Sequence, residues 1–194
     1  IASGKTLHQL AGIPIGIMDA AYITCMRTGA AGALGALHLA RKNSKTLMLL
    51  GAGKQAPFQI AASLILMPWI KKINIVDPIA NSNAIKLALE IRELLKSDFN
   101  LEISEEVSFV PVESIEEATK DSDIIITVTP SRKPLIKKDW VKPGTHFSCL
   151  GSDMEGKEEI DPEILVGAKI YTDDIAQCIR VGEIEIPINK SMIS

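Results

Sequence analysis

The chain has few residues of the kinds that build disulfide-bonded, metal-binding or membrane-spanning proteins. Its 194 residues include three cysteines and three histidines, and only 4% are aromatic. Cys25, Cys149 and Cys178 lie far apart and are odd in number, which argues against a disulfide framework or a zinc site. No apolar run reaches the length of a membrane span, and no charged segment followed by an apolar one stands at the start. We therefore expect a cytoplasmic protein without a metal site or a membrane partner.

A large excess of one charge is also missing. The chain has 21 lysines and arginines against 24 acidic residues, giving a formal net charge of −3. Because no basic block occurs, the sequence does not favour nucleic acid as a partner. Hydrophobic residues make up 46% of the chain, which is enough to bury a globular core.

Short apolar runs alternate with helical patterns along most of the chain. This alternation is typical of βαβ units, whose right-handed crossovers give a doubly wound parallel sheet, so we expect an α/β protein of the Rossmann type. Residues 7–24 are expected to be extended and then to turn, and residues 184–193 to be extended without an identified partner. The expected strands are 46–50, 73–77, 107–110, 123–128 and 145–150, with 169–172 as a further candidate, and the expected helices are 26–41, 55–67, 81–96 and 114–120.

The clearest motif is a glycine-rich turn between an expected strand and an expected helix. Gly51-Ala52-Gly53-Lys54-Gln55-Ala56 matches the dinucleotide-binding pattern G-x-G-x-x-G/A. Gly51 permits the tight turn, Gly53 lets the backbone approach a pyrophosphate, and Ala56 allows the helix to pack closely on the strand. A helix N-terminus at this point favours anions. We therefore predict that Gly51, Ala52, Gly53, Lys54 and Gln55 bind NAD.

Asp77 ends the next expected strand, in the window where an acidic residue meets the adenosine ribose in such folds. A carboxylate there accepts hydrogen bonds from the ribose hydroxyls and repels a 2′-phosphate, so NAD(H) is favoured over NADP(H). The alternative is that Asp77 only begins a turn with Pro78.

Two later segments follow expected strands and should border the same crevice, because ligands bind at the carboxyl ends of parallel strands. Within Thr127-Val128-Thr129-Pro130-Ser131, we predict cofactor contacts near the nicotinamide ribose from Thr127, Val128, Thr129 and Ser131. Asp153 follows the other strand and could handle a substrate amine or a proton, although a turn aspartate is the alternative. Arg27, at a helix start, could hold a substrate carboxylate or could be an ordinary surface residue.

Five motifs in this order resemble those of the ornithine cyclodeaminase and mu-crystallin family, which includes the archaeal-type alanine dehydrogenases. They are Arg27-Thr28-Gly29-Ala30-Ala31, the glycine-rich turn, Thr127–Ser131, Leu150-Gly151-Ser152-Asp153 and Val181-Gly182-Glu183. The resemblance implies that Arg27 binds the substrate carboxylate and that Asp153 is catalytic near the amino group. It also implies that Gly51, Gly53, Gln55 and Asp77 form the NAD site, with Thr127 beside it.

The resemblance further implies an NAD-dependent amino-acid enzyme of the ornithine cyclodeaminase type. Such enzymes transfer hydride from the amino-acid α-carbon, pass through an imine and release ammonia, and they act as homodimers on small amino acids. An amino-acid dehydrogenase or a ketimine reductase of the same family is one alternative. Another is an NAD(H)-binding module without catalysis, because no lysine here matches the catalytic lysine that the family carries in its N-terminal part.

Family members are also longer than this chain, so the resemblance implies truncation at both ends. Residues 1–25 are expected to be a remnant of the dimerisation and substrate domain. Residues 26–180 are expected to form the NAD-binding domain. Residues 181–194 are expected to return toward the dimerisation domain.

Overall fold

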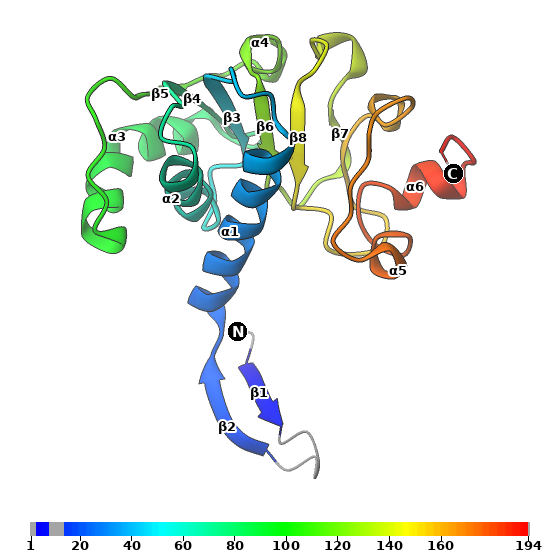
Figure 1. Ribbon diagram of the computed structural model, residues 1–194, viewed down its shortest axis with the longest axis horizontal. Coiled ribbons are helices and arrows are strands. Elements are labelled where there is room, and N and C mark those ends of the chain that lie inside the picture. The colour runs from blue at the N-terminus through cyan, green and yellow to red at the C-terminus, as the bar shows by residue number, and fades with distance from the viewer. Residues whose placement is uncertain (1–2, 8–13, 194) are drawn as a thin grey trace.

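The centre of the protein is a five-stranded parallel sheet (Figure 1). The computed structural model describes residues 3–7 and 14–193. The sheet has the spatial order β5-β4-β3-β6-β8, so the chain steps outward on one side of β3 and then returns to the other side. This order confirms the predicted doubly wound Rossmann-type fold, with the switch point between β3 and β6. The strands are β3 (Thr46–Leu50), β4 (Lys72–Val76), β5 (Ser108–Pro111), β6 (Ile124–Thr127) and β8 (His146–Cys149).

Helices cover both faces of this sheet (Figure 1). On one face lie α1 (Ala21–Leu39), α2 (Ala56–Leu66) and α3 (Asn81–Phe99), and on the other lies α4 (Ile115–Asp121). The N-terminus of α4 is capped by the Ser114 hydroxyl, which accepts the Glu117 N–H at 3.2 Å. This cap is the one that a Ser-x-x-Glu sequence predicts.

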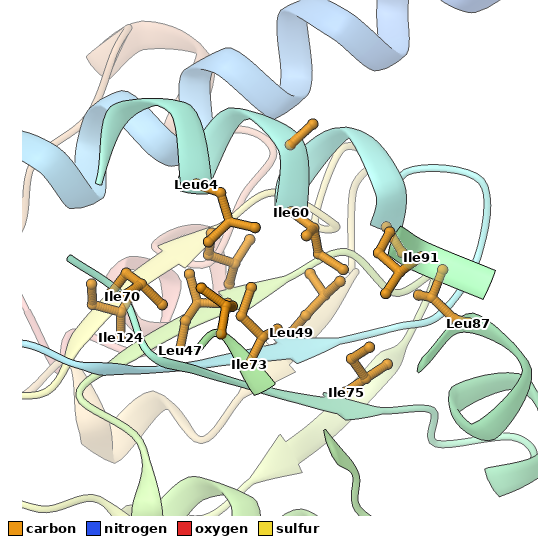
Figure 2. Close-up of a cluster of buried hydrophobic side chains, with 14 of the residues drawn as sticks. Leu47, Leu49, Ile60, Leu64, Ile70, Ile73, Ile75, Leu87, Ile91 and Ile124 are labelled. Atoms are coloured by element: carbon orange, nitrogen blue, oxygen red, sulfur yellow. The ribbon is translucent and has the colours of Figure 1, made fainter. Parts of the chain in front are cut away.

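Successive residues of the central strands enter two different cores. Leu47 and Leu49 pack with Ile60 and Ile91 beneath the helices of one face (Figure 2). Met48 faces the opposite core. Because both faces are covered, the strands are apolar throughout and lack the alternation of a half-exposed sheet.

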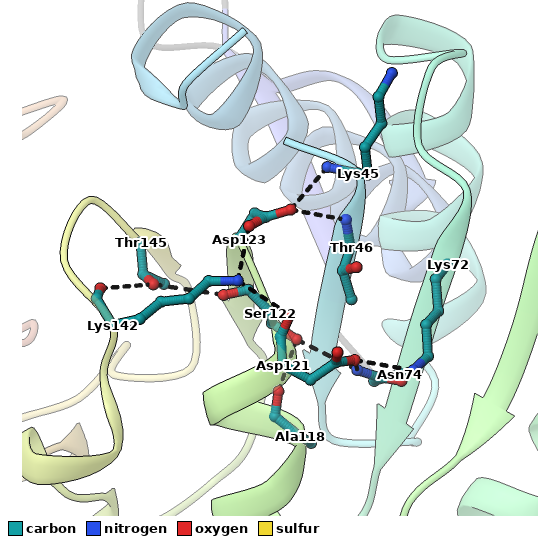
Figure 3. Close-up of polar contacts among 10 residues, drawn as sticks. All are labelled: Lys45, Thr46, Lys72, Asn74, Ala118, Asp121, Ser122, Asp123, Lys142 and Thr145. Carbon is teal, nitrogen blue, oxygen red and sulfur yellow. Dashed lines mark hydrogen bonds and ion pairs between the residues drawn. The ribbon is translucent and has the colours of Figure 1, made fainter. Parts of the chain in front are cut away.

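Carboxylates fasten the amino ends of the central strands (Figure 3). Asp123, just before β6, accepts the backbone N–H groups of Lys45 and Thr46 at 2.8 and 3.1 Å. Asp121 accepts the Asn74 amide of β4 at 2.7 Å. This side of the sheet is opposite the carboxyl ends, where the predicted site lies.

Three expectations about secondary structure are wrong. Helix α1 begins at Ala21 and not at residue 26. The turn expected at the end of residues 7–24 is therefore the first part of this helix. Residues 169–172 form no strand, and the high exposure of Tyr171 shows that no neighbouring strand covers them. Residues 184–193 are not extended, because they contain α6 (Glu185–Asn189), whose Glu185 carboxylate is buried and accepts the Gly156 N–H at 3.1 Å.

Two further strand pairs lie outside the main sheet and were not predicted as pairs. β1 (Ser3–Leu7) pairs antiparallel with β2 (Pro14–Asp19), which confirms the extended part of residues 7–24 as far as it is described; residues 8–13 lie outside the described residues. β7 (Arg132–Ile136) pairs in parallel with β9 (Glu158–Ile160). The remaining short elements are the 3-10 turns η1 (Lys138–Trp140) and η2 (Pro162–Ile164) and the helix α5 (Ile175–Cys178).

The expected domain boundaries meet continuous structure. Helix α1 runs across the boundary between residues 25 and 26, and the segment after residue 180 is hydrogen-bonded to β9 through Glu183.

Within residues 3–7 and 14–193, no helix is long and apolar enough to cross a membrane.

Candidate functional site

The glycine-rich turn leaves the carboxyl end of β3 in a conformation that requires glycine. Gly51 has a φ of +111°, and its N–H donates to the Val76 carbonyl oxygen at 2.8 Å. A Cβ at Gly51 would lie 3.0 Å from the carbonyl oxygen of Val128. Gly51 therefore combines a left-handed backbone with a close approach to the segment after β6, as its predicted role requires.

Gly53 differs from Gly51 because it borders open space. A Cβ built there would meet no atom of the described residues within 4 Å, and its φ lies outside the left-handed region. The fold itself therefore does not need glycine at this position. A bound group lying against the turn would need it, which is the condition that a dinucleotide pyrophosphate sets.

The turn also offers backbone donors for an anion. Helix α2 begins at the fully buried Ala56, and Pro57 occupies its first turn. In the described part of the chain, no protein acceptor takes a hydrogen bond from the N–H groups of Gly53, Lys54 or Gln55. Free N–H groups at a helix N-terminus suit a phosphate, so these residues fit the pyrophosphate of NAD.

Asp77 lies next to this turn, at the end of β4. Its Oδ2 accepts the Ala52 N–H at 3.1 Å, and its Oδ1 accepts the N–H groups of Ile79 and Ala80, each at 3.0 Å. Burial alone would raise the pKa of Asp77, but these hydrogen bonds and one from Asn83 lower it below its ordinary value. The Asp77 carboxylate is therefore negatively charged at neutral pH. It also holds the glycine-rich turn through its hydrogen bond from the Ala52 N–H.

The segment after β6 contributes to the site in two ways. Val128 and Thr129 line a hollow, whereas the Thr127 side chain is fully buried and donates its hydroxyl to Glu159 at 2.6 Å. Ser131 donates its hydroxyl to the carbonyl oxygen of Lys133. The Thr127 hydroxyl therefore does not face the hollow. It holds the Glu159 carboxylate behind the wall.

The hollow has a volume of about 1500 Å³ and opens beside the glycine-rich turn. Its wall includes Arg27 from α1, Gln55 at the start of α2, and Asp153 after β8. Asp153 forms an ion pair with Lys157, whose side chain is only 13% exposed and also lines the hollow. The structure therefore brings the predicted substrate residues Arg27 and Asp153 to the same hollow as Val128, while Gly51, Ala52, Gly53, Lys54 and Asp77 lie outside its lining.

Three charged residues of the site were missed by sequence reasoning. Glu159 is fully buried behind the wall, and Lys157 and Glu183 line the hollow. Lys157 follows Asp153 by four residues, a spacing at which a lysine can pair with the carboxylate, and this was the available signal. Glu183 belongs to the Val181-Gly182-Glu183 motif but had no assigned role, and no local pattern marks Glu159.

The Glu183 side chain is partly buried, and its carboxyl lies beside other acidic groups. Its Oε1 accepts the Ser152 hydroxyl and the Glu159 N–H, the latter at 2.8 Å, while its Oε2 accepts only the distant Ile160 N–H at 3.4 Å. Burial raises the pKa of Glu183 to about 7, and the nearby charge of Glu159 adds to the rise. Burial also raises the pKa of the Cys149 thiol, which lies close to both carboxyls.

Comparison with known proteins identifies the family. The family model of the ornithine cyclodeaminase/mu-crystallin family matches residues 6–194. The chain belongs to this family. It is 38% identical over 182 residues to the alanine dehydrogenase of Archaeoglobus fulgidus, which covers 94% of this chain, and 32% identical over 176 residues to the ornithine cyclodeaminase of Agrobacterium tumefaciens, covering 90%. The family resemblance stated from the motifs is thereby confirmed.

Solved structures of family members have the same fold. Thermococcus litoralis Δ1-pyrroline-2-carboxylate reductase in complex with NADH and L-proline superposes with a TM-score of 0.81 at 33% identity, over 97% of this chain and 55% of that one. An archaeal alanine dehydrogenase dimer with bound NAD gives a TM-score of 0.77 at 38% identity, over 97% and 54%. The chain spans about half the length of the relatives it matches: 52% of the alanine dehydrogenase and 46% of the ornithine cyclodeaminase.

Substitution by alanine should have different effects at the two glycines of the glycine-rich turn, Gly51 and Gly53. For Gly53→Ala we expect the free energy of unfolding to stay the same or rise by up to about 1 kcal/mol, because the new methyl group meets no protein atom. Its affinity for NADH should fall by roughly tenfold or more, because the methyl group occupies the space of the pyrophosphate. Gly51→Ala is the matched control and should lose about 1–3 kcal/mol of stability through backbone strain. Urea titration and calorimetric NADH titration measure both effects, and unchanged NADH binding in Gly53→Ala would contradict the assignment.

The partly buried Glu183 should make stability depend on pH. The carboxyl ionises near pH 4.5 when unfolded and at about 7 when folded, so the folded state holds a proton that the unfolded state has lost between these values. The free energy of unfolding should therefore fall as pH rises through this window, by on the order of 2–3 kcal/mol from this group. In Glu183→Gln the fall should be much smaller. The exposed Glu163→Gln is the control, and equal slopes in urea titrations of all three proteins would refute the assignment.

Proposed function

We propose that this chain forms the NAD(H) site and part of the amino-acid site of an NAD-dependent enzyme of the ornithine cyclodeaminase type. One observation carries the proposal. At the switch point of the sheet, a glycine-rich turn with free N–H groups meets, through Gln55, a hollow that is lined by both Arg27 and Asp153. Such a crevice, at the carboxyl ends of parallel strands, is where doubly wound folds bind dinucleotides. Relatives solved with NAD, NAD⁺ or NADH support the choice of cofactor.

The cofactor would be held mainly by the backbone on its adenosine side. The free N–H groups of Gly53, Lys54 and Gln55 would donate to the pyrophosphate oxygens, with the start of α2 adding its positive end. The charged Asp77 would accept hydrogen bonds from the adenosine ribose hydroxyls. Val128 and Thr129 would border the nicotinamide side, with Ser131 further along the same segment.

The substrate would be bound by side chains. The Arg27 guanidinium is exposed in the hollow and could grip a carboxylate with two parallel hydrogen bonds. The Asp153 carboxylate would take a proton from the substrate amino group as the α-carbon loses hydride, and Lys157 would keep that carboxylate oriented. When bound, NAD⁺ supplies the hydride acceptor, and the resulting imine would be hydrolysed or captured by a second amine.

Two other functions follow from specific observations. An amino-acid dehydrogenase or ketimine reductase is favoured by the relatives named alanine dehydrogenase, iminosuccinate reductase and Δ1-pyrroline-2-carboxylate reductase. An NAD(H)-binding module without turnover is the other alternative, because the free N–H groups of the glycine-rich turn would hold the cofactor whether or not a substrate is bound. We also propose that the chain acts as a homodimer, by analogy with the archaeal alanine dehydrogenase dimer.

Asp77 should determine which nicotinamide cofactor binds. The chain is expected to prefer NADH over NADPH by at least about tenfold, because the Asp77 charge repels a 2′-phosphate. Asp77→Ala should weaken NADH binding by roughly tenfold and reduce the preference over NADPH. Asp98→Ala serves as the control, because Asp98 of α3 has its neighbour Ser97 as its one side-chain hydrogen-bond partner among the described residues. Thermal melts must show that Asp77→Ala is folded, since the carboxylate also braces Ala52. A wild-type chain without preference would exclude the ribose role.

Turnover distinguishes the candidate activities. The purified chain is mixed with NAD⁺ and with ornithine, lysine or alanine, and NADH and ammonia are measured in parallel. Ammonia without net NADH is the result expected for the cyclodeaminase type, whereas NADH formation with alanine would establish a dehydrogenase. With either activity, Asp153→Asn should lower turnover by at least about a hundredfold, because the amide cannot take a proton. NADH binding without turnover would mean that the chain is a cofactor-binding module or an incomplete enzyme.

A further inference from the structure

The carboxylate of Glu159, near the hollow, is fully buried and accepts four hydrogen bonds. Its Oε1 accepts the N–H and the hydroxyl of Thr129 at 2.6 and 2.7 Å. Its Oε2 accepts the Thr127 hydroxyl at 2.6 Å and the Gly151 N–H at 2.9 Å. Two of these donors are N–H groups that can only donate, so the group is built to be an acceptor at both oxygens.

The four donors come from the two strands that border the hollow. Thr127 and Thr129 flank Val128 at the end of β6, and Gly151 follows β8. The contact is close, since a Cβ at Gly151 would lie 2.2 Å from the Thr129 carbonyl oxygen and 2.5 Å from the Glu159 carboxyl carbon. β6 and β8 are already paired up to Thr127 and Cys149, and Glu159 joins the segments that continue beyond this pairing, from behind the wall.

A second carboxyl extends this arrangement toward Asp153. Glu183 accepts the Ser152 hydroxyl and the N–H of Glu159 itself. Gly151 and Ser152 are therefore both tethered, one to each carboxyl, immediately before Asp153. By contrast, the glycine-rich turn is held by separate hydrogen bonds, from Gly51 to Val76 and from Ala52 to Asp77.

We propose that Glu159 is a positioning residue for the nicotinamide half of the cofactor. By joining the ends of β6 and β8, it sets the wall formed by Val128 and Thr129 against the loop that carries Asp153. Because the carboxylate is buried, it acts through these residues and does not contact the ligand. This inference rests on the proposed function, and its consequence is selective: losing the carboxylate disturbs the nicotinamide side and spares the adenosine side.

Two ligands separate these sides. NADH contains both halves, whereas ADP-ribose contains the adenosine, both phosphates and a ribose but no nicotinamide. We expect the wild-type chain to bind NADH more tightly than ADP-ribose in calorimetric titrations. In Glu159→Gln the amide nitrogen cannot accept an N–H, so one strand end loses its tether. NADH affinity should then fall by about tenfold, while ADP-ribose affinity stays within about twofold of the wild-type value.

Glu158→Gln is the matched control, because Glu158 is the adjacent buried acid of β9 and its Oε1 has no partner among the described residues. It should leave both affinities unchanged. Thr127 provides a milder pair of variants in case Glu159→Gln does not fold: Thr127→Val removes one donor to Glu159, and Thr127→Ser keeps it. Only Thr127→Val should lose the preference for NADH.

The outcomes are distinct. Equal losses for NADH and ADP-ribose in the Glu159 and Thr127→Val variants would mean a general structural role and would overturn the proposal. Unchanged NADH affinity in these variants, or a wild-type chain that binds both ligands equally, would overturn it as well. A wild-type chain that binds neither ligand would refute the proposed function itself, and with it this inference.

Discussion

An ionised carboxylate can be buried only where its oxygens are supplied with hydrogen-bond donors, and this condition shapes the carboxyl edge of the sheet. Glu159 lies on β9, outside the main sheet, yet all four of its donors come from the segments that end β6 and β8. The two strand ends must therefore keep the spacing that the carboxylate demands. Gly151 and Ser152 are hydrogen-bonded to Glu159 and Glu183 immediately before Asp153, and both Val128 and Asp153 line the hollow.

The two edges of the sheet are fastened by the same chemistry in different surroundings. At the amino edge, Asp121 and Asp123 hold β3 and β4 through backbone N–H groups, an amide and partly exposed lysines. Exposed ion pairs of this kind contribute little stability, because water competes for both partners. At the carboxyl edge Glu159 is fully buried, so an unsatisfied donor or acceptor there is costly and the geometry is strongly specified. The edge that bears the candidate site is thus the edge with the tighter constraint.

This difference also explains what could be predicted from the sequence. The turn at Gly51 and the brace at Asp77 involve residues that are close in sequence or that occupy known places in a βαβ unit, so a motif reveals them. The central strands were predictable because their burial on both faces leaves continuous apolar runs. Glu159, in contrast, bonds to Thr127 and Thr129, which are 32 and 30 residues away in the sequence. No local sequence pattern distinguishes a glutamate that will be buried from one that will be exposed to solvent, so its role could not be predicted. The prediction that residues 184–193 are extended was wrong for a related reason. Alternating isoleucines are typical of a strand, but this segment forms helix α6, whose buried Glu185 accepts the N–H of the distant Gly156.

The site that we propose would therefore have two halves of different physical origin. The adenosine half would consist mostly of backbone N–H groups, which any sequence that preserves the turn can present. The nicotinamide and substrate half would consist of side chains: Arg27 on α1, and Asp153 and Lys157 on the segment that Glu159 holds through Gly151. Relatives that share the fold carry names for different reactions, from alanine dehydrogenase to ornithine cyclodeaminase and iminosuccinate reductase. A turn made of backbone atoms cannot distinguish those substrates, so whatever this chain contributes to the distinction would come from the side chains that face the hollow.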